Sequence, residues 1–178
     1  MDQTLARELL DFIAASPSTF HVIDNFADML RKAGCRELRE EEPWTLEPGQ
    51  RYFLTRNGST LAAFRVPREL RGGFALAAAH SDSPTFKLKD NPQRTAAGHY
   101  TQLCCEKYGG MLMSTWFDRP LSAAGRVLVR TGDGVETRLV NINRDLAVIP
   151  NVAIHMNRAA NDGMKYQANV DTYPLLGS

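Results

Sequence analysis

The feature of this sequence that most constrains its fold is an unbroken apolar run, Phe74–Ala79, which ends abruptly in the polar sequence His80-Ser-Asp-Ser-Pro84. A strand with no polar face is typical of a central strand whose sheet is covered on both sides, as in α/β proteins. Ligands of open α/β sheets gather at the carboxyl ends of the strands. The pattern therefore predicts an α/β fold with a ligand-binding polar cluster directly after the run.

His80 and Asp82 are the side chains of this cluster that have the chemistry of a metal site. A neutral imidazole is the commonest protein ligand of zinc, and a metal-bound histidine usually donates its other ring N–H to a carboxylate. Asp82 could therefore orient His80 or bind a metal itself. The alternative is structural: a hydrogen-bonded histidine at a strand end, beside an Asx-turn that Asp82 and Ser83 form before Pro84. The His-x-Asp spacing alone does not decide between the two.

The residues before the apolar run predict two helices and a hairpin. Apolar residues recur at helical spacing until Ser16-Pro17 ends the first pattern, and Gly34 is well placed to end the second. Asn57-Gly58 is the strongest short hairpin signal and separates two strand patterns. The predicted elements are helices over residues 5–13 and 22–30 and strands over residues 52–55 and 59–66.

After Asn91-Pro92 the sequence loses long helical stripes and shows short strand patterns instead. Thr131-Gly-Asp-Gly134 is typical of a turn between two of them. The predicted strands are 111–117, 125–130, 135–142 and 152–156. We therefore expect a domain border near residues 90–95, which divides an N-terminal α/β part, residues 1–91, from a β-rich module, residues 92–178.

The other histidines and the cysteines give weaker signals. His155 falls in the last predicted strand, and a lone histidine there is more often structural than catalytic. His21 is expected in the first turn of the second helix, where packing or capping explains it. His99 with the neighbours Cys104 and Cys105 lacks a fourth ligand, and adjacent cysteines rarely close a tetrahedral zinc site.

Charge and composition exclude several classes of protein. The net charge of +1 does not provide the excess of positive charge that is typical of proteins that bind nucleic acid or an anionic membrane surface. The longest apolar run has six residues, far short of the ~20 that span a bilayer. Acidic residues near the N-terminus argue against a signal peptide, and three cysteines without Cys-x-x-Cys spacing fit a reducing cytoplasm. The nucleophile-elbow, phosphate-loop and dinucleotide-binding motifs are all missing from the sequence.

Several specific motifs occur in order along the chain: Ser16-Pro-Ser-Thr-Phe-His21, Trp44-x-Leu-x-Pro-Gly49, Arg56-Asn-Gly-Ser-x-Leu-Ala-Ala-Phe64, His80-Ser-Asp-Ser-Pro84, Tyr108-Gly-Gly110, Trp116-Phe-Asp-Arg119, Ala124-Gly-Arg-Val127 and Ile149-Pro-x-Val-Ala-Ile-His155. With these motifs the chain resembles the N-terminal part of the aspartyl aminopeptidases over nearly all 178 residues. The ordered set is far more specific than any one of its members.

The resemblance implies a zinc-peptidase-like α/β catalytic domain, here its N-terminal part, interrupted by a β-rich dimerisation domain that is incomplete in this chain. It implies an enzyme with two zinc ions and an activated water, which releases N-terminal Asp or Glu from peptides. Dimers of such proteins build a dodecamer, so the chain's expected partners are peptides and further copies of itself.

The resemblance also assigns three residues. His80 matches the first metal ligand, and Asp82 matches the catalytic-site carboxylate that orients it. His155 matches a histidine that either binds zinc or reaches a neighbouring subunit's active site to hold substrate. The second role is favoured, because His155 lies in the inserted module.

Family chains are much longer than this one, and the remaining zinc ligands and the glutamate general base are expected beyond its last residue. The alternative is a chain that acts only as an oligomerisation or binding module and is catalytically inactive without those ligands.

Overall fold

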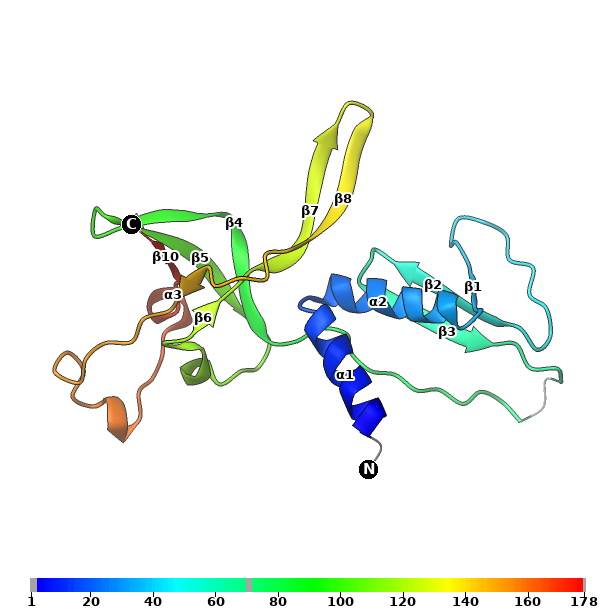
Figure 1. Cartoon of the computed structure of the whole chain (residues 1–178), viewed down its shortest axis with the longest axis horizontal. Coiled ribbons are helices and arrows are strands. Elements are labelled where there is room, and N and C mark those ends of the chain that lie inside the picture. The colour runs from blue at the N-terminus through cyan, green and yellow to red at the C-terminus, as the bar shows by residue number, and fades with distance from the viewer. Residues whose placement is uncertain (1–2, 70–71, 178) are drawn as a thin grey trace. The chain divides into compact units, whose positions relative to one another are not determined.

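The computed structural model describes residues 3–69 and 72–177, whose contacts divide the chain into two compact units (Figure 1). The first unit comprises the chain up to Asp82 together with Ala124–Asn141, and the second comprises Ser83–Ala123 together with the chain from Ile142 onward. Helices and sheets are mixed along the chain, in agreement with the predicted α/β class. Within the described ranges, no helix combines the length and the apolar character that a membrane crossing requires.

Helices α1 (Gln3–Ala15) and α2 (Thr19–Lys32) of the first unit form where the sequence predicts them. The rings of Phe12 and Phe26, 4.8 Å apart, pack the two helices together. Gly34 ends the second helix as expected: its φ is +76°, and its N–H donates to the Arg31 carbonyl at 2.9 Å. A left-handed residue at this place satisfies a carbonyl that the helix end leaves unpaired.

A three-stranded sheet of order β1-β2-β3 follows these helices in the first unit. Its strands are β1 (Arg36–Glu37), β2 (Arg51–Arg56) and β3 (Thr60–Arg65). The antiparallel pair β2–β3 confirms the predicted hairpin. Asn57 and Gly58 in its turn have φ values of 54° and 61°. Two adjacent positive φ angles define the turn that Asn-Gly favours.

The core of the first unit lies between α2 and the middle strand. Tyr52 and Phe53 are consecutive on β2 and are 1% and 0% exposed. Successive side chains of a strand point to opposite faces, so both faces of β2 are covered. Helix α2 contributes the buried Ile23 and Ala27. The Tyr52 hydroxyl accepts a hydrogen bond from the Glu47 N–H at 2.9 Å, which satisfies its polar end.

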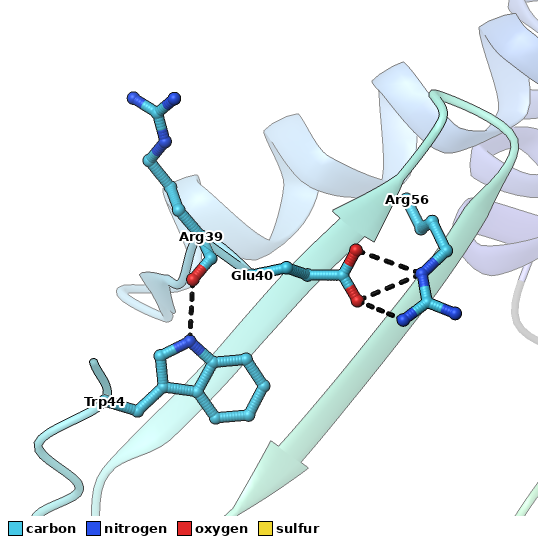
Figure 2. Close-up of polar contacts among 4 residues, drawn as sticks. All are labelled: Arg39, Glu40, Trp44 and Arg56. Atoms are coloured by element: carbon cyan, nitrogen blue, oxygen red, sulfur yellow. Dashed lines mark hydrogen bonds and ion pairs between the residues drawn. The ribbon is translucent and has the colours of Figure 1, made fainter. Parts of the chain in front are cut away.

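The connection between β1 and β2 is irregular and is fixed by polar contacts (Figure 2). Trp44 Nε1 donates to the Arg39 carbonyl at 2.7 Å. The Glu40 carboxylate accepts hydrogen bonds from Nε and Nη2 of Arg56 on β2. These bonds from Arg56 hold the pKa of Glu40 below its ordinary value. All these groups are charged or polar and solvent-exposed, so the pair contributes little to stability.

A second hairpin, β7 (Ala124–Thr131) with β8 (Gly134–Asn141), also confirms a sequence prediction and belongs to the first unit. Arg126 attaches it to the helix and sheet. The guanidinium carbon lies 4.2 Å from the centroid of the Phe20 ring, and Nη1 donates to the Asn57 carbonyl at 2.7 Å.

The second unit is built on a five-stranded sheet of order β4-β5-β10-β9-β6. Its elements are β4 (Thr85–Ala96), β5 (Tyr100–Tyr108), η1 (Met113–Trp116), β6 (Pro120–Leu121), β9 (Ala147–Val148), η2 (Ala160–Asp162), α3 (Ala168–Asp171) and β10 (Leu175–Gly177). The buried residues of its described part are Cys105, Ile149, Thr172, Tyr173 and Pro174. The unit is β-rich, as the sequence predicts for this part of the chain.

The strand predicted at Phe74–Ala79 is wrong: none of its residues is assigned to a strand. Phe74 and Leu76 are 88% and 91% exposed. An apolar run indicates that its side chains favour burial. A strand also needs a neighbouring strand that pairs with its backbone N–H and C=O groups. No described strand pairs with this segment.

Two further predicted strands are wrong. Residues 111–117 contain the 3₁₀ helix η1, whose Trp116 ring packs edge-on against Phe86 with centroids 5.1 Å apart. Residues 152–156 contain a turn, closed by the Met156 N–H donating to the Ala153 carbonyl at 2.8 Å. In both cases, closely spaced apolar residues take part in packing or in a turn and do not form a strand that pairs with another.

The expected border near residues 90–95 lies inside β4. The contacts divide the chain after Asp82 instead. They also assign β7 and β8, which lie later in the sequence, to the first unit. Whether residues 1–91 and 92–178 correspond to catalytic and dimerisation domains stays a prediction.

Candidate metal centre

His80 and Asp82 contact each other, as the sequence suggests they can. His80 Nδ1 lies 3.0 Å from Asp82 Oδ1 and 2.9 Å from the Asp82 carbonyl oxygen. Both partners are acceptors, so a neutral His80 ring carries its proton on Nδ1 and donates it to Asp82. The lone pair of Nε2 is then available to a ligand, and no described residue hydrogen-bonds to this nitrogen.

The His80 ring is held in place by its hydrogen bond to Asp82. The side chain is too exposed for packing to fix its orientation. Its side chain is 82% exposed, whereas that of Asp82 is 39% exposed. A neutral imidazole whose Nδ1–H is donated to a carboxylate has the arrangement of a histidine that binds zinc through Nε2. The pair therefore fits one position of a zinc site.

The described residues contain no group of three or more His, Cys, Asp and Glu side chains that could hold a metal ion. A zinc site needs at least three protein ligands, and His80 with Asp82 supplies at most two donors. The residues that are present thus fit part of a zinc site and do not complete one within the described part of the chain.

His155 lies in the turn Ile154–Met156 of the second unit and is exposed. Its predicted place in a strand is therefore wrong. An exposed turn leaves the imidazole accessible to a substrate or to another subunit. The two roles that the resemblance allows for His155 both stay predictions.

The contacts and burial of His21, Cys104 and Cys105 are those of structural residues. His21 lies in the first turn of α2, where its Nδ1 is hydrogen-bonded to the Ser18 hydroxyl at 2.7 Å. Cys104 is half-buried and Cys105 is buried, and burial raises the pKa of Cys105 to about 11. A thiol with so high a pKa carries almost no thiolate near neutral pH, so Cys105 is neither a nucleophile nor a ready metal ligand.

Two of the open hollows among the described residues of the first unit are well defined, and neither is lined by His80 or Asp82. One, of about 570 Å³, lies under the charged β1–β2 connection of Figure 2 and is lined by Leu38, Glu42 and Thr55 among others. The other, of about 450 Å³, lies between α2 and the β7–β8 hairpin. The candidate metal centre is therefore a surface arrangement within the described part of the chain.

The sequence model of the family described as "Aminopeptidase I zinc metalloprotease (M18)" matches residues 12–178. A Clostridium novyi relative named "Probable M18 family aminopeptidase 2" is 48% identical over 177 residues, which are 97% of this chain and 41% of the relative. The chain spans about two fifths of the length of the curated relatives it matches.

Solved structures resemble the chain over nearly its whole length. A chain in a cryo-EM structure of an Ape4 and Nbr1 complex has a TM-score of 0.93 and 41% identity, covering 98% of this chain and 34% of that chain. The S. cerevisiae mApe1 dodecamer has a TM-score of 0.74 and 29% identity, covering 96% of this chain and 38% of that chain.

Proposed function

Because this chain belongs to the aminopeptidase I (M18) family of zinc metalloproteases, we propose that it contributes His80 and Asp82 to a two-zinc aminopeptidase site. The site releases N-terminal Asp or Glu from peptides. The observation that carries the proposal is the Nδ1–H to carboxylate hydrogen bond of 3.0 Å, which leaves Nε2 of His80 exposed for a metal.

His80 and Asp82 have separate tasks in this proposal. Nε2 of His80 is a zinc ligand, and Asp82 fixes the tautomer and the angle of the ring. A bound zinc lowers the pKa of a water molecule and polarises the scissile carbonyl. The remaining ligands and the general base that takes the proton from water lie in the region by which the relatives are longer.

His155 donates a hydrogen bond to the oxyanion that develops on the substrate carbonyl. Its exposed turn in the second unit supports this role, and so does the dodecameric state of the S. cerevisiae relative. We place the donor in a neighbouring subunit's site, which makes self-association necessary for activity. The zinc-ligand role of His155 is the competing assignment.

The three cysteines are free, which supports a reducing cytoplasm as the protein's compartment. Selectivity for acidic residues requires a cation near the substrate side chain. We place that cation in the further region of the relatives as well.

The substrate class is tested with an extended form, defined here as a protein that carries this chain together with the region by which its relatives are longer. Peptides that differ only in an N-terminal Asp, Glu, Asn or Leu are compared by kcat/KM. Preference for Asp and Glu supports the proposal, whereas equal rates for Asp and Leu contradict the acidic specificity.

The substitution Asp82→Asn in the extended form should lower zinc affinity or kcat/KM by about 10–100-fold and leave the fold intact. The amide keeps the size of the side chain but removes the charge that orients the Nδ1–H of His80. Zinc affinity is measured by chelator competition, and folding by circular dichroism. A variant that binds zinc and turns over like the parent favours the Asx-turn role of Asp82 instead.

A further inference from the structure

The side chains of residues 80–82 alternate in the way that is typical of extended chain. His80 and Asp82 meet on one side, with Nδ1 and Oδ1 3.0 Å apart. The Ser81 side chain makes its contacts with other elements, Thr19 of α2 and Ser59 of the β2–β3 turn. Neighbouring side chains of an extended chain point in opposite directions. Ser81 therefore anchors the segment from the side opposite to the metal-binding pair.

The two hydrogen bonds of Ser81 have a defined direction. Ser81 Oγ donates to the Ser59 carbonyl at 3.2 Å, and its distance to Thr19 Oγ1 is 2.8 Å. A serine hydroxyl has a single proton, so the Thr19 hydroxyl is the donor in the shorter bond. Ser81 thus donates one bond and accepts another, and both are partly buried.

Both anchors belong to firmly built parts of the first unit. Thr19 is the first residue of α2, whose Ile23 is buried in the core. Ser59 closes the hairpin turn, where its N–H donates to the Arg56 carbonyl at 3.1 Å. Arg126 holds the same turn through the Asn57 carbonyl.

The chain that leads to His80 offers much weaker support. Phe74 and Leu76 are almost fully exposed, and no described strand pairs with this segment. The His80 ring itself is 82% exposed. Packing therefore contributes little to its orientation, which depends on Asp82 and on the position of the backbone that Ser81 holds. A metal ligand has to be held within about 0.5 Å of its productive place.

We propose that Ser81 is a positioning residue. Its hydrogen bonds to Thr19 of α2 and to Ser59 of the β2–β3 turn hold the backbone between His80 and Asp82 in a fixed position. This inference rests on the proposed role of His80 as a zinc ligand. Ser81 does not touch the metal or the substrate. Its hydroxyl fixes the backbone positions from which the His80 and Asp82 side chains extend. It thereby fixes the direction in which Nε2 of His80 points.

The test compares Ser81→Ala with Ser81→Thr, which keeps the hydroxyl, and with Ser83→Ala, the same change two residues further on at an exposed position. In the extended form, Zn²⁺ alone is titrated against a chelating dye. Ser81→Ala should weaken zinc binding about 10-fold, the lower end of the effect of residues that support a metal ligand. Ser81→Thr and Ser83→Ala should bind within about twofold of the parent.

A second readout needs no metal. In the present chain, which contains four histidines, the ring nitrogen shifts of ¹⁵N-labelled His80 report its tautomer. The parent should show a ring protonated on Nδ1, and Ser81→Ala should show a mixture of tautomers. Thr19→Val removes one of the two hydrogen bonds of Ser81 and should shift the tautomers in the same direction to a smaller extent. The double variant should be no worse than Ser81→Ala alone, because Ser81→Ala already removes the bond to Thr19.

The outcomes separate this inference from the proposed function. If His80→Ala loses zinc while Ser81→Ala keeps the affinity and the tautomer of the parent, the positioning role is refuted and the zinc role of His80 stands. If His80→Ala keeps all its zinc, the proposed function fails, and the inference fails with it. Equal loss in Ser81→Ala and Ser81→Thr also refutes the role of the hydroxyl.

Discussion

Replacing His80 with alanine should remove zinc from the extended form and lower peptide hydrolysis by several orders of magnitude. Zinc-site affinity depends on each of a small number of protein ligands, and Ala offers no donor atom in place of Nε2. Activation of the attacking water requires the metal, so the chemical step should fail even when the peptide still binds. Metal content is measured by elemental analysis, and kcat is measured with excess substrate.

The matched control is His99→Ala, which removes an exposed histidine from the turn between β4 and β5. This variant should keep the metal content and the activity of the parent. Unchanged metal content in His80→Ala would contradict the assignment, whatever its effect on activity.

The second large effect is expected at His155. Removing one hydrogen-bond donor to an oxyanion typically costs about 2.7–4 kcal/mol of transition-state stabilisation, or about 10²–10³ in kcat. His155→Ala in the extended form should therefore lower kcat by that factor while zinc content and oligomeric mass stay unchanged. Because His155 lies in an exposed turn, its loss should leave the fold intact. Zinc loss in this variant would favour the zinc-ligand role.

Mixing experiments decide which subunit His155 serves. His80→Ala and His155→Ala proteins, each expected to have strongly reduced activity, are combined under conditions in which subunits exchange. In a mixed dimer, the intact zinc site of a His155→Ala chain meets the intact His155 of its neighbour, so activity should partly return. If mass analysis shows exchange and no activity returns, His155 acts within its own chain or is structural.

Local patterns of the sequence are sufficient to predict helices α1 and α2 and the β2–β3 and β7–β8 hairpins. Asn57-Gly58 and Gly34 have the positive φ angles that their positions require. Such turns depend on the conformational preferences of one or two residues, which a sequence displays directly. The end of α1 before Pro17 follows from the same kind of rule.

Pairing that depends on distant partners could not be predicted in this way. Strand β4 carries many charged residues and Pro92, so it lacks the apolar alternation of a strand signal, yet it forms a long ladder with β5. The run Phe74–Ala79 has the opposite problem. Its composition favours burial, but the chain offers it no described partner strand, and we expect the partners in the further region of the relatives.

The same distinction holds at the candidate metal centre. Contact between His80 and Asp82 could be predicted, because residues two apart in extended chain point to the same side. The anchoring of Ser81 could not, because its partners Thr19 and Ser59 are 62 and 22 residues away. Thr19 occurs in the motif Ser16–His21, but only the fold brings it next to Ser81, between His80 and Asp82.

In the proposed function, this chain supplies one zinc ligand, His80, to a two-zinc site whose other ligands lie outside it. Calorimetric titration with Zn²⁺ of the present 178-residue chain, alongside the extended form, tests this claim most directly. We predict two tightly bound zinc ions per extended chain and no tight binding by the present chain, because one imidazole and one carboxylate cannot complete either site. Tight binding of two zinc ions by the present chain alone would contradict the account.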